Sequence, residues 1–265
     1  VIARRVEPGS VFKLLVSLYM AARRPDLARD YRYRCTGAPD NAIMPDRCWK
    51  PGGHGDTDLA HALSGSCNLY FASLYAHIDR ADFLEFMRSL SRQLGLTLVL
   101  PEVPDDGKFA KLLCGLDYRA TMTVRDLVKL ALVVSPAAVT LRGVEDFRRT
   151  VPPAYLGLIS DALADTVRTG TASGASEPYG SARENIEPLR PAGPGQDDAF
   201  PGDLGTGECW GKTSTVMTGT NRHLSFGLFL GGDRNTGLIV LISRGNGHLA
   251  ARWALRILRR GRALP

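Results

Sequence analysis

The sequence predicts an α+β domain in which helices come first, an antiparallel sheet follows, and a last helix closes the chain. Helical periodicity dominates residues 11–168, whereas residues 209–243 have the composition and period of strands. Short turns between those strands favour antiparallel pairing, and the separation of helices from strands is typical of α+β proteins. A length of 265 residues allows one domain with a helical lobe.

The first predicted helix, about residues 11–22, is apolar nearly all round, which indicates a helix buried in the core. It contains Lys13, a buried amine that must find a partner or lose its proton. Residues 31–55 are rich in Gly, Pro, Cys and aromatic residues and predict a hairpin and a loop. Further helices are predicted at about 57–63, 68–78, 80–94 (closed by Gly95), 124–135 (capped by Thr123 and Asp126) and 153–168 (Pro153 in its first turn).

The C-terminal part changes character. Residues 171–206 contain Gly, Ser, Ala, Pro and acids without a period, which predicts a long, mobile surface loop. The last helix, about 248–260, is predicted to bury Leu249, Trp253 and Ile257. Strands are predicted at 209–217, 223–230 and 237–243, with a hairpin-like turn at 231–235.

The composition excludes several classes of protein. A hydrophobic content of 44% and a charged content of 23% are ordinary for a globular chain. No run of about 18 apolar residues marks a membrane span, and no secretory signal is visible. The formal net charge of +6 is spread along the chain apart from 256–262, which favours a solvated basic surface and no nucleic-acid partner.

The five cysteines have no metal-ligand spacing such as C-x-x-C, so no metal site is predicted. Cys35 and Cys48 bracket a turn-rich stretch, and a disulfide between them or two free thiols are equal alternatives. An odd number leaves at least one cysteine unpaired within the chain. His54 lies between glycines in a loop, which favours a structural over a catalytic role.

The motif Ser10-Val-Phe-Lys13 places two polar side chains on one face at the start of a helix. A serine hydroxyl becomes a nucleophile only beside a base, and a desolvated lysine with a lowered pKa can be that base. The helix N-terminus adds backbone N–H groups beside a developing oxyanion. The alternative is a capping serine followed by a lysine that reaches solvent.

Two further motifs supply the other groups that acyl transfer needs. Ser66 and Asn68 lie between helices, where a hydroxyl can relay a proton and a carboxamide can bind a peptide; the alternative is two capping residues. Lys212, Thr213 and Thr215 lie in a predicted strand that can pair with an extended peptide and bind its carboxylate. The alternative is an edge strand whose polar side chains face water.

These motifs follow one another at intervals of 56 and 146 residues. In order, spacing and flanking sequence the chain resembles the penicillin-binding proteins, the serine D,D-transpeptidases that cross-link bacterial cell-wall peptides, and most of all their monofunctional, class B-like transpeptidase domain. The resemblance covers nearly the whole chain. The matching segments are Glu7–Lys13, Gly53–Gly55, Leu63–Phe71, Val167–Ala172 and Trp210–Thr213.

The resemblance implies a β-lactamase/transpeptidase-like fold and a peptidoglycan D,D-transpeptidase of the periplasm, at the outer face of the cytoplasmic membrane. It implies a serine acyl-enzyme with D-alanyl-D-alanine stem peptides, covalent binding of penicillin and other β-lactams, possible cell-wall synthesis partners, and no cofactor. Ser10 would be the nucleophile, Lys13 its base and Ser66 the proton shuttle. Asn68, Lys212, Thr213 and Thr215 would bind substrate, and the backbone N–H groups of Ser10 and Thr215 would form the oxyanion hole.

Two departures from the family pattern leave other functions open. The first departure is Ser214, which stands where the family has glycine. The second is that only nine residues precede Ser10. Residues 1–265 are therefore expected to be a truncated domain, with its first strands and a membrane anchor upstream. One alternative is a non-catalytic penicillin sensor or an inactive binding protein of a cell-wall complex. A third is a serine β-lactamase or D,D-carboxypeptidase, although no glutamate-plus-asparagine motif for deacylation is evident.

Overall fold

The computed structural model describes residues 3–44, 47–135, 141–173, 209–218, 224–233, 236–243 and 245–262. Most of the predicted loop 171–206 therefore lies outside the described residues. In chain order the elements are β1 (Arg5–Val6), η1 (Gly9–Val11), α1 (Phe12–Arg23), α2 (Pro25–Asp30), β2 (Tyr33–Cys35), β3 (Gly55–Thr57), α3 (Leu59–Ser64), α4 (Asn68–Ser73), η2 (Leu74–Ala76), α5 (Arg80–Leu94), α6 (Asp106–Leu113), β4 (Met122–Thr123), α7 (Val124–Val134), α8 (Arg142–Thr150), α9 (Pro153–Arg168), β5 (Trp210–Thr218), β6 (Leu224–Gly232), β7 (Gly237–Ser243) and α10 (Gly247–Arg262).

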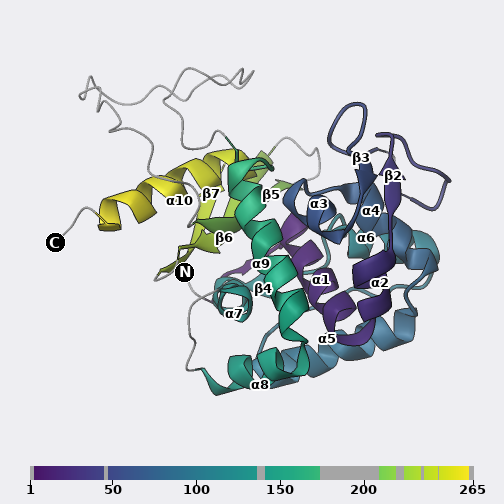
Figure 1. The fold of residues 1–265 in the computed structure, drawn as a ribbon, viewed down its shortest axis with the longest axis horizontal. Coiled ribbons are helices and arrows are strands. Elements are labelled where there is room, and N and C mark those ends of the chain that lie inside the picture. The colour runs from purple at the N-terminus through teal and green to yellow at the C-terminus, as the bar shows by residue number, and fades with distance from the viewer. Residues whose placement is uncertain are drawn as a thin grey trace.

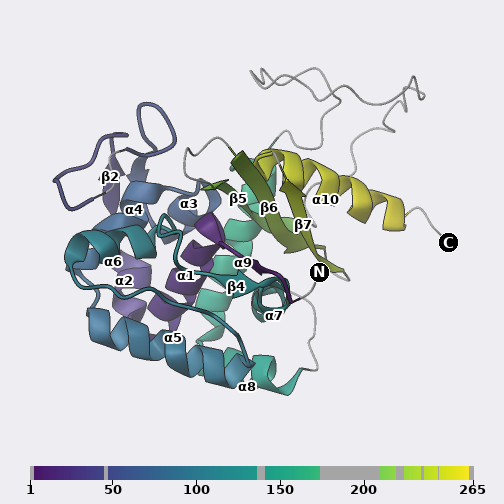
Figure 2. The same cartoon turned by 180° about the vertical axis from the view of Figure 1, so that it is seen from behind.

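The predicted α+β arrangement is confirmed. β5, β6 and β7 form an antiparallel meander in that order, with Lys212 opposite Leu230 and Leu230 opposite Ile239. α10 lies along one face of this sheet (Figures 1 and 2), and α7 approaches β6 and β7 from the helical lobe. Two smaller antiparallel pairs, β1–β4 and β2–β3, fix the start of the chain and the hairpin region. None of the helices in the described part is long and apolar enough to cross a membrane.

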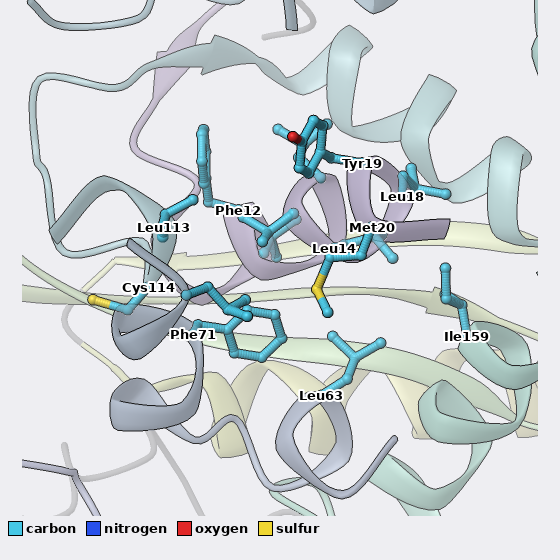
Figure 3. Packing of buried hydrophobic residues seen from close by; sticks show 14 of the residues in the cluster. Phe12, Leu14, Leu18, Tyr19, Met20, Leu63, Phe71, Leu113, Cys114 and Ile159 are labelled. Carbon is cyan, nitrogen blue, oxygen red and sulfur yellow. The ribbon is translucent and has the colours of Figure 1, made fainter. Parts of the chain in front are cut away.

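Helix α1 is the centre of the helical lobe. Its side chains from Phe12 to Ala21 are all buried, because the helix is apolar all round and is in contact with α2, α3, α5, α6 and α9. Figure 3 shows Phe12, Leu14 and Leu18 of α1 in one core together with Phe71 of α4 and Leu113 of α6. The core is thus built around the helix that carries Lys13.

Local signals placed the helix ends correctly. Gly95 closes α5 in the left-handed conformation, with φ of 60°, and Thr123 and Asp126 form a capping box at the start of α7. The prediction missed α2, α6 and α8. α2 is only six residues long, and α8 carries only two large apolar side chains, Val144 and Phe147, so each repeat is too short to recognise in the sequence.

The predicted burial of α10 was wrong. Trp253 and Ile257 are 50% and 53% exposed. The helix packs on the sheet instead through a neighbouring stripe, which consists of Ala250, Ala251, Ala254, Leu255 and Leu258. Small side chains allow the helix to approach closely: a Cβ on Gly227 of β6 would lie 1.9 Å from the carbonyl oxygen of Asn246, which precedes α10. The face of α10 that packs on the sheet is therefore determined by the small size of its side chains as well as by their hydrophobicity.

Candidate active site

Ser10 lies in η1, the tight turn that leads into α1. β1 pairs with β4 just before this turn, and the N–H of Val11 donates to the carbonyl of Pro8 at 3.0 Å. Gly9 has a φ of 51°, a value that glycine adopts readily and other residues rarely do. The nucleophile predicted from the sequence therefore lies at the start of the buried helix, fixed from both sides.

Lys13 is completely buried, and its Nζ lies 2.8 Å from Oγ of Ser10 and 2.8 Å from Oδ1 of Asn68. Burial lowers the pKa of the Lys13 amine to about 8, because water no longer solvates the ammonium form. A fraction of the amine is therefore neutral near neutral pH and can accept the hydroxyl proton of Ser10. The alternative of a lysine reaching solvent is wrong.

Ser66 and Asn68 lie on either side of Cys67 in the turn between α3 and α4. Ser66 has a φ of 53°, the one positive φ among the described non-glycine residues. The N–H of Cys67 donates to Ala62, and Cys67 Sγ accepts the N–H of Tyr70 at 3.4 Å, which caps α4. Such a strained residue indicates a turn held by its surroundings. This turn presents the Asn68 amide to Lys13.

Strand β5 buries Lys212 and Thr213, so the alternative of an edge strand whose side chains face water is wrong for these two residues. Burial, and after it the charge of nearby Lys13, hold the pKa of Lys212 well below its usual value. The hydroxyl of Thr213 is hydrogen-bonded to that of Thr171, a residue without a predicted role. Thr215 is exposed, and its Oγ1 accepts the N–H of Gly247 at 2.9 Å.

Ser214 contacts the nucleophile turn directly. The backbone N–H of Ser10 donates to Oγ of Ser214 at 2.9 Å, and the Ser214 side chain is buried. From the sequence, a serine in place of the family's glycine is expected either to crowd this strand or to shift its register. The structure shows that its hydroxyl takes one of the two N–H donors predicted to form the oxyanion hole.

The predicted residues thus meet to different degrees. Ser10, Lys13 and Asn68 form one hydrogen-bonded chain. Ser214 joins β5 to these three residues, and Lys212 lies close enough for the charge of Lys13 to lower its pKa. Among the described residues, Ser66 and Thr215 make no hydrogen bond to Ser10. They are connected to Ser10, Lys13 and Asn68 only through their neighbours in sequence.

A second group of polar side chains lies beside the Ser66–Asn68 turn and could hold a metal ion. Sγ of Cys35, Cys48 and Cys67 and a ring nitrogen of His54 all lie within 4.8 Å of one another. Nδ1 of His54 is 3.4 Å from Cys48 Sγ and 3.7 Å from Cys35 Sγ, and Cys48 Sγ is 4.0 Å from Cys67 Sγ. All five cysteines are free thiols, so of the two alternatives for Cys35 and Cys48 the structure has the thiols.

The geometry of this thiol–imidazole group suits a tetrahedral ion. Zn–S bonds of about 2.3 Å place the sulfurs of a tetrahedral site about 3.8 Å apart, close to the spacing here. Nε2 of His54 lies 3.0 Å from the carbonyl oxygen of Gly65, so a proton on Nε2 leaves the lone pair of Nδ1 facing the thiols. Sequence spacing missed the group because its four members are separated by 13, 6 and 13 residues. The β2–β3 pair brings Cys35 beside His54, and the cap of α4 supplies Cys67.

Solved structures with a similar fold are transpeptidase domains of penicillin-binding proteins. Pseudomonas aeruginosa PBP2 has a TM-score of 0.65 and 17% identity, over 100% of this chain and 62% of that one. Helicobacter pylori PBP2, solved in complex with MreC, has a TM-score of 0.69 and 15% identity, over 97% of this chain and 50% of that one. Penicillin-binding protein A of M. tuberculosis, solved as a penicillin G acyl-enzyme, has a TM-score of 0.65 and 15% identity, over 99% of this chain and 62% of that one.

These similarities establish the fold. No protein-family model matches the chain, and no curated protein matches it in sequence. The chain spans between one half and 62% of the length of the three structures. The described residues therefore have the fold of a penicillin-binding protein transpeptidase domain, with helices followed by a C-terminal antiparallel sheet.

Proposed function

We propose that this chain is the transpeptidase region of a penicillin-binding protein and forms an acyl-enzyme on Ser10. The observation that carries the proposal is the 2.8 Å contact between Oγ of Ser10 and the buried Nζ of Lys13. A hydroxyl beside an amine with a pKa of about 8 is the arrangement that nucleophilic catalysis by serine needs. The fold similarity supports the same function.

The reaction would run in two halves. Neutral Lys13 takes the proton of Ser10 while Oγ attacks the carbonyl between the two D-alanines of a stem peptide. The C–N bond then breaks as the Ser66 hydroxyl gives its proton to the leaving D-alanine nitrogen and takes in exchange the proton that Lys13 had accepted, so Lys13 is neutral again for the second half. An acceptor amine next attacks the ester, and Ser10 regains its proton. Backbone N–H groups of Ser10 and Thr215 would stabilise both oxyanions.

Substrate binding would use the remaining residues of the three motifs. Lys212, Thr213 and Thr215 would bind the terminal carboxylate, whose negative charge favours the protonated form of Lys212, and Asn68 would hold the amide backbone of the peptide. β-Lactams would enter as substrates that stay attached to Ser10. Peptidoglycan stem peptides and other cell-wall synthesis proteins would be the partners, at the outer face of the cytoplasmic membrane; the similarity to a PBP2 solved with MreC supports such partners.

A β-lactam labelling experiment tests this function. Intact-mass measurement after incubation with penicillin G is expected to give one adduct on the wild type and none on Ser10→Ala. Lys13→Ala is expected to slow labelling by orders of magnitude, because general-base assistance contributes about 10²–10⁴-fold. A folded wild-type chain without an adduct would contradict the proposal.

A non-catalytic sensor is the second candidate, and one observation favours it. In the resting protein the N–H of Ser10 donates to Ser214, so an oxyanion must displace that contact at each acyl-transfer step, which favours slow turnover. Turnover of a D-alanyl-D-alanine peptide distinguishes the two, because a sensor becomes acylated by penicillin but releases no D-alanine. Rapid loss of the penicillin adduct would instead indicate a β-lactamase, and D-alanine release without cross-linking would indicate a carboxypeptidase.

A further inference from the structure

Ser214 and the nucleophile turn form one tightly fitted contact. Oγ of Ser214 accepts the N–H of Ser10 at 2.9 Å, and a Cβ built on Gly9 would lie 2.2 Å from the same Oγ. The serine hydroxyl therefore fills the space that the missing side chain of Gly9 leaves. The contact is shielded from water, because Ser214 is almost completely buried.

The backbone of Ser214 is held from the opposite side. A Cβ on Gly247, the first residue of α10, would lie 2.7 Å from the carbonyl oxygen and 2.8 Å from the nitrogen of Ser214. Ser214 is also paired with Leu228 of β6 within the ladder. The strand is thus fixed between α10 and the nucleophile turn. Rotation of the Ser214 side chain is the small movement that can release the Ser10 N–H.

We propose that Ser214 is a positioning residue that holds the Ser10 N–H in the resting protein and must release it before the oxyanion of the acylation step can be bound. This inference rests on the proposed function, since it concerns the oxyanion hole of the same site. A neutral hydroxyl and the oxyanion compete for one donor. The oxyanion is the stronger acceptor because its hydrogen bond is charge-assisted, so the contact delays acylation without preventing it.

The expected size of the delay follows from one hydrogen bond. Breaking a hydrogen bond between two neutral groups in a buried site raises the activation barrier enough to slow the reaction about fivefold. Ser214→Ala removes the acceptor but keeps Cβ, and is expected to raise the second-order rate constant of acylation by penicillin about fivefold. Its melting temperature is expected to fall, because the partly buried Ser10 N–H loses its partner in the resting state. A faster but less stable variant is the signature of this contact.

Two more substitutions keep the inference testable. Ser214→Gly also removes the acceptor and is expected to accelerate acylation, so it serves if the alanine variant folds poorly. Ser214→Cys keeps a side chain of similar shape with a weaker acceptor and is expected to fall between wild type and alanine. Ser73→Ala is the matched control: it removes another buried hydroxyl, which donates to the Tyr70 carbonyl, and should lower stability without changing acylation.

The outcomes separate this inference from the proposed function. Absence of any penicillin adduct on the folded wild type contradicts the proposed function itself. An adduct on the wild type, with acylation rates unchanged in both Ser214→Ala and Ser214→Gly, overturns only the role of Ser214. Slower acylation in both variants overturns it as well, and would mean that the Ser214 hydroxyl donates its own proton to the oxyanion.

Discussion

Nζ of Lys13 and Oδ1 of Asn68 lie 2.8 Å apart inside the core, so the side-chain amide of the first residue of α4 holds the amine against Ser10. The amide is neutral, so it offsets less of the cost of a buried charge than a carboxylate would. Burial can therefore lower the pKa of Lys13 to about 8 while the amine stays fixed in place. Burial sets the proton affinity of the base, and the hydrogen bond to Asn68 sets its position.

The first prediction is a pH dependence of acylation. Lys13 acts as a base only when neutral, so the acylation rate constant should rise with pH and level off above about 8. Stopped-flow labelling with a fluorescent penicillin from pH 6 to 10 would measure the profile. A rate that is flat through this range would contradict a lysine base.

The lowered pKa of Lys13 also has a consequence for stability. Folded Lys13 loses its proton near 8, whereas its ordinary value is 10.5, so between these pH values the unfolded chain holds the extra proton. The free energy of unfolding should therefore gain a contribution that rises with pH across this window. Lys13→Met removes the titrating amine, and urea unfolding of this variant should lack that contribution.

The second prediction concerns Asn68→Asp. A carboxylate in place of the amide would stabilise the ammonium form of Lys13 and raise its pKa. The midpoint of the acylation profile should move to higher pH, and the rate at pH 7 should fall about tenfold each time the midpoint rises by one on the pH scale. Asn68→Ala, which adds no charge, is the control and should leave the midpoint at or below its wild-type value. Equal midpoints for the aspartate and alanine variants would contradict the argument.

The third prediction concerns the pair of Gly9 and Ser214. Gly9→Ala introduces a Cβ at a φ of 51°, 2.2 Å from Ser214 Oγ and 2.7 Å from Val216. The strain and the overlap together should cost about 2–4 kcal/mol in the free energy of unfolding. Adding Ser214→Gly removes one of the two overlaps and should restore part of the loss.

A matched glycine keeps this third test specific. Gly157→Ala lies in α9, where a new Cβ meets nothing within 4 Å, and should stabilise the protein by up to about 1 kcal/mol. Chemical unfolding of the four variants measures all of these values. An additive result for Gly9→Ala and Ser214→Gly would show that the two positions do not share one space.

Local chemistry made much of this fold predictable. Gly95, Thr123 and Asp126 act through neighbours in sequence, so their caps could be predicted directly. The all-round apolar pattern before Ala22 gave the buried helix for the same reason. By contrast, the outward orientation of Trp253 depends on the close approach of α10 to β6, which no window of the sequence contains.

The candidate site likewise has features that could be predicted from local sequence and features that depend on the tertiary fold. The three motifs could be found because each is short, and their order gave the resemblance. The bond from Ser10 N–H to Ser214 joins residues 204 positions apart, and its direction depends on how β5 packs against the nucleophile turn. The thiol–imidazole group was missed because Cys35 and His54 meet only through the pairing of β2 with β3.

The last prediction concerns metal binding by Cys35, Cys48, His54 and Cys67. Three thiols and an imidazole within 4.8 Å form a ligand set typical of a structural zinc site. Purified protein should bind about one equivalent of Zn²⁺ by elemental analysis, and a chelator should lower its melting temperature, because the ion links the loop after β2 to the start of α4.

Cys48→Ser should lose the bound zinc, whereas Cys209→Ser, outside the group, should keep it. A folded wild-type chain that neither retains Zn²⁺ nor gains stability when Zn²⁺ is added would mean that the group is a packed cluster of thiols. In that case Cys67 holds the Ser66–Asn68 turn through its cap on Tyr70 alone.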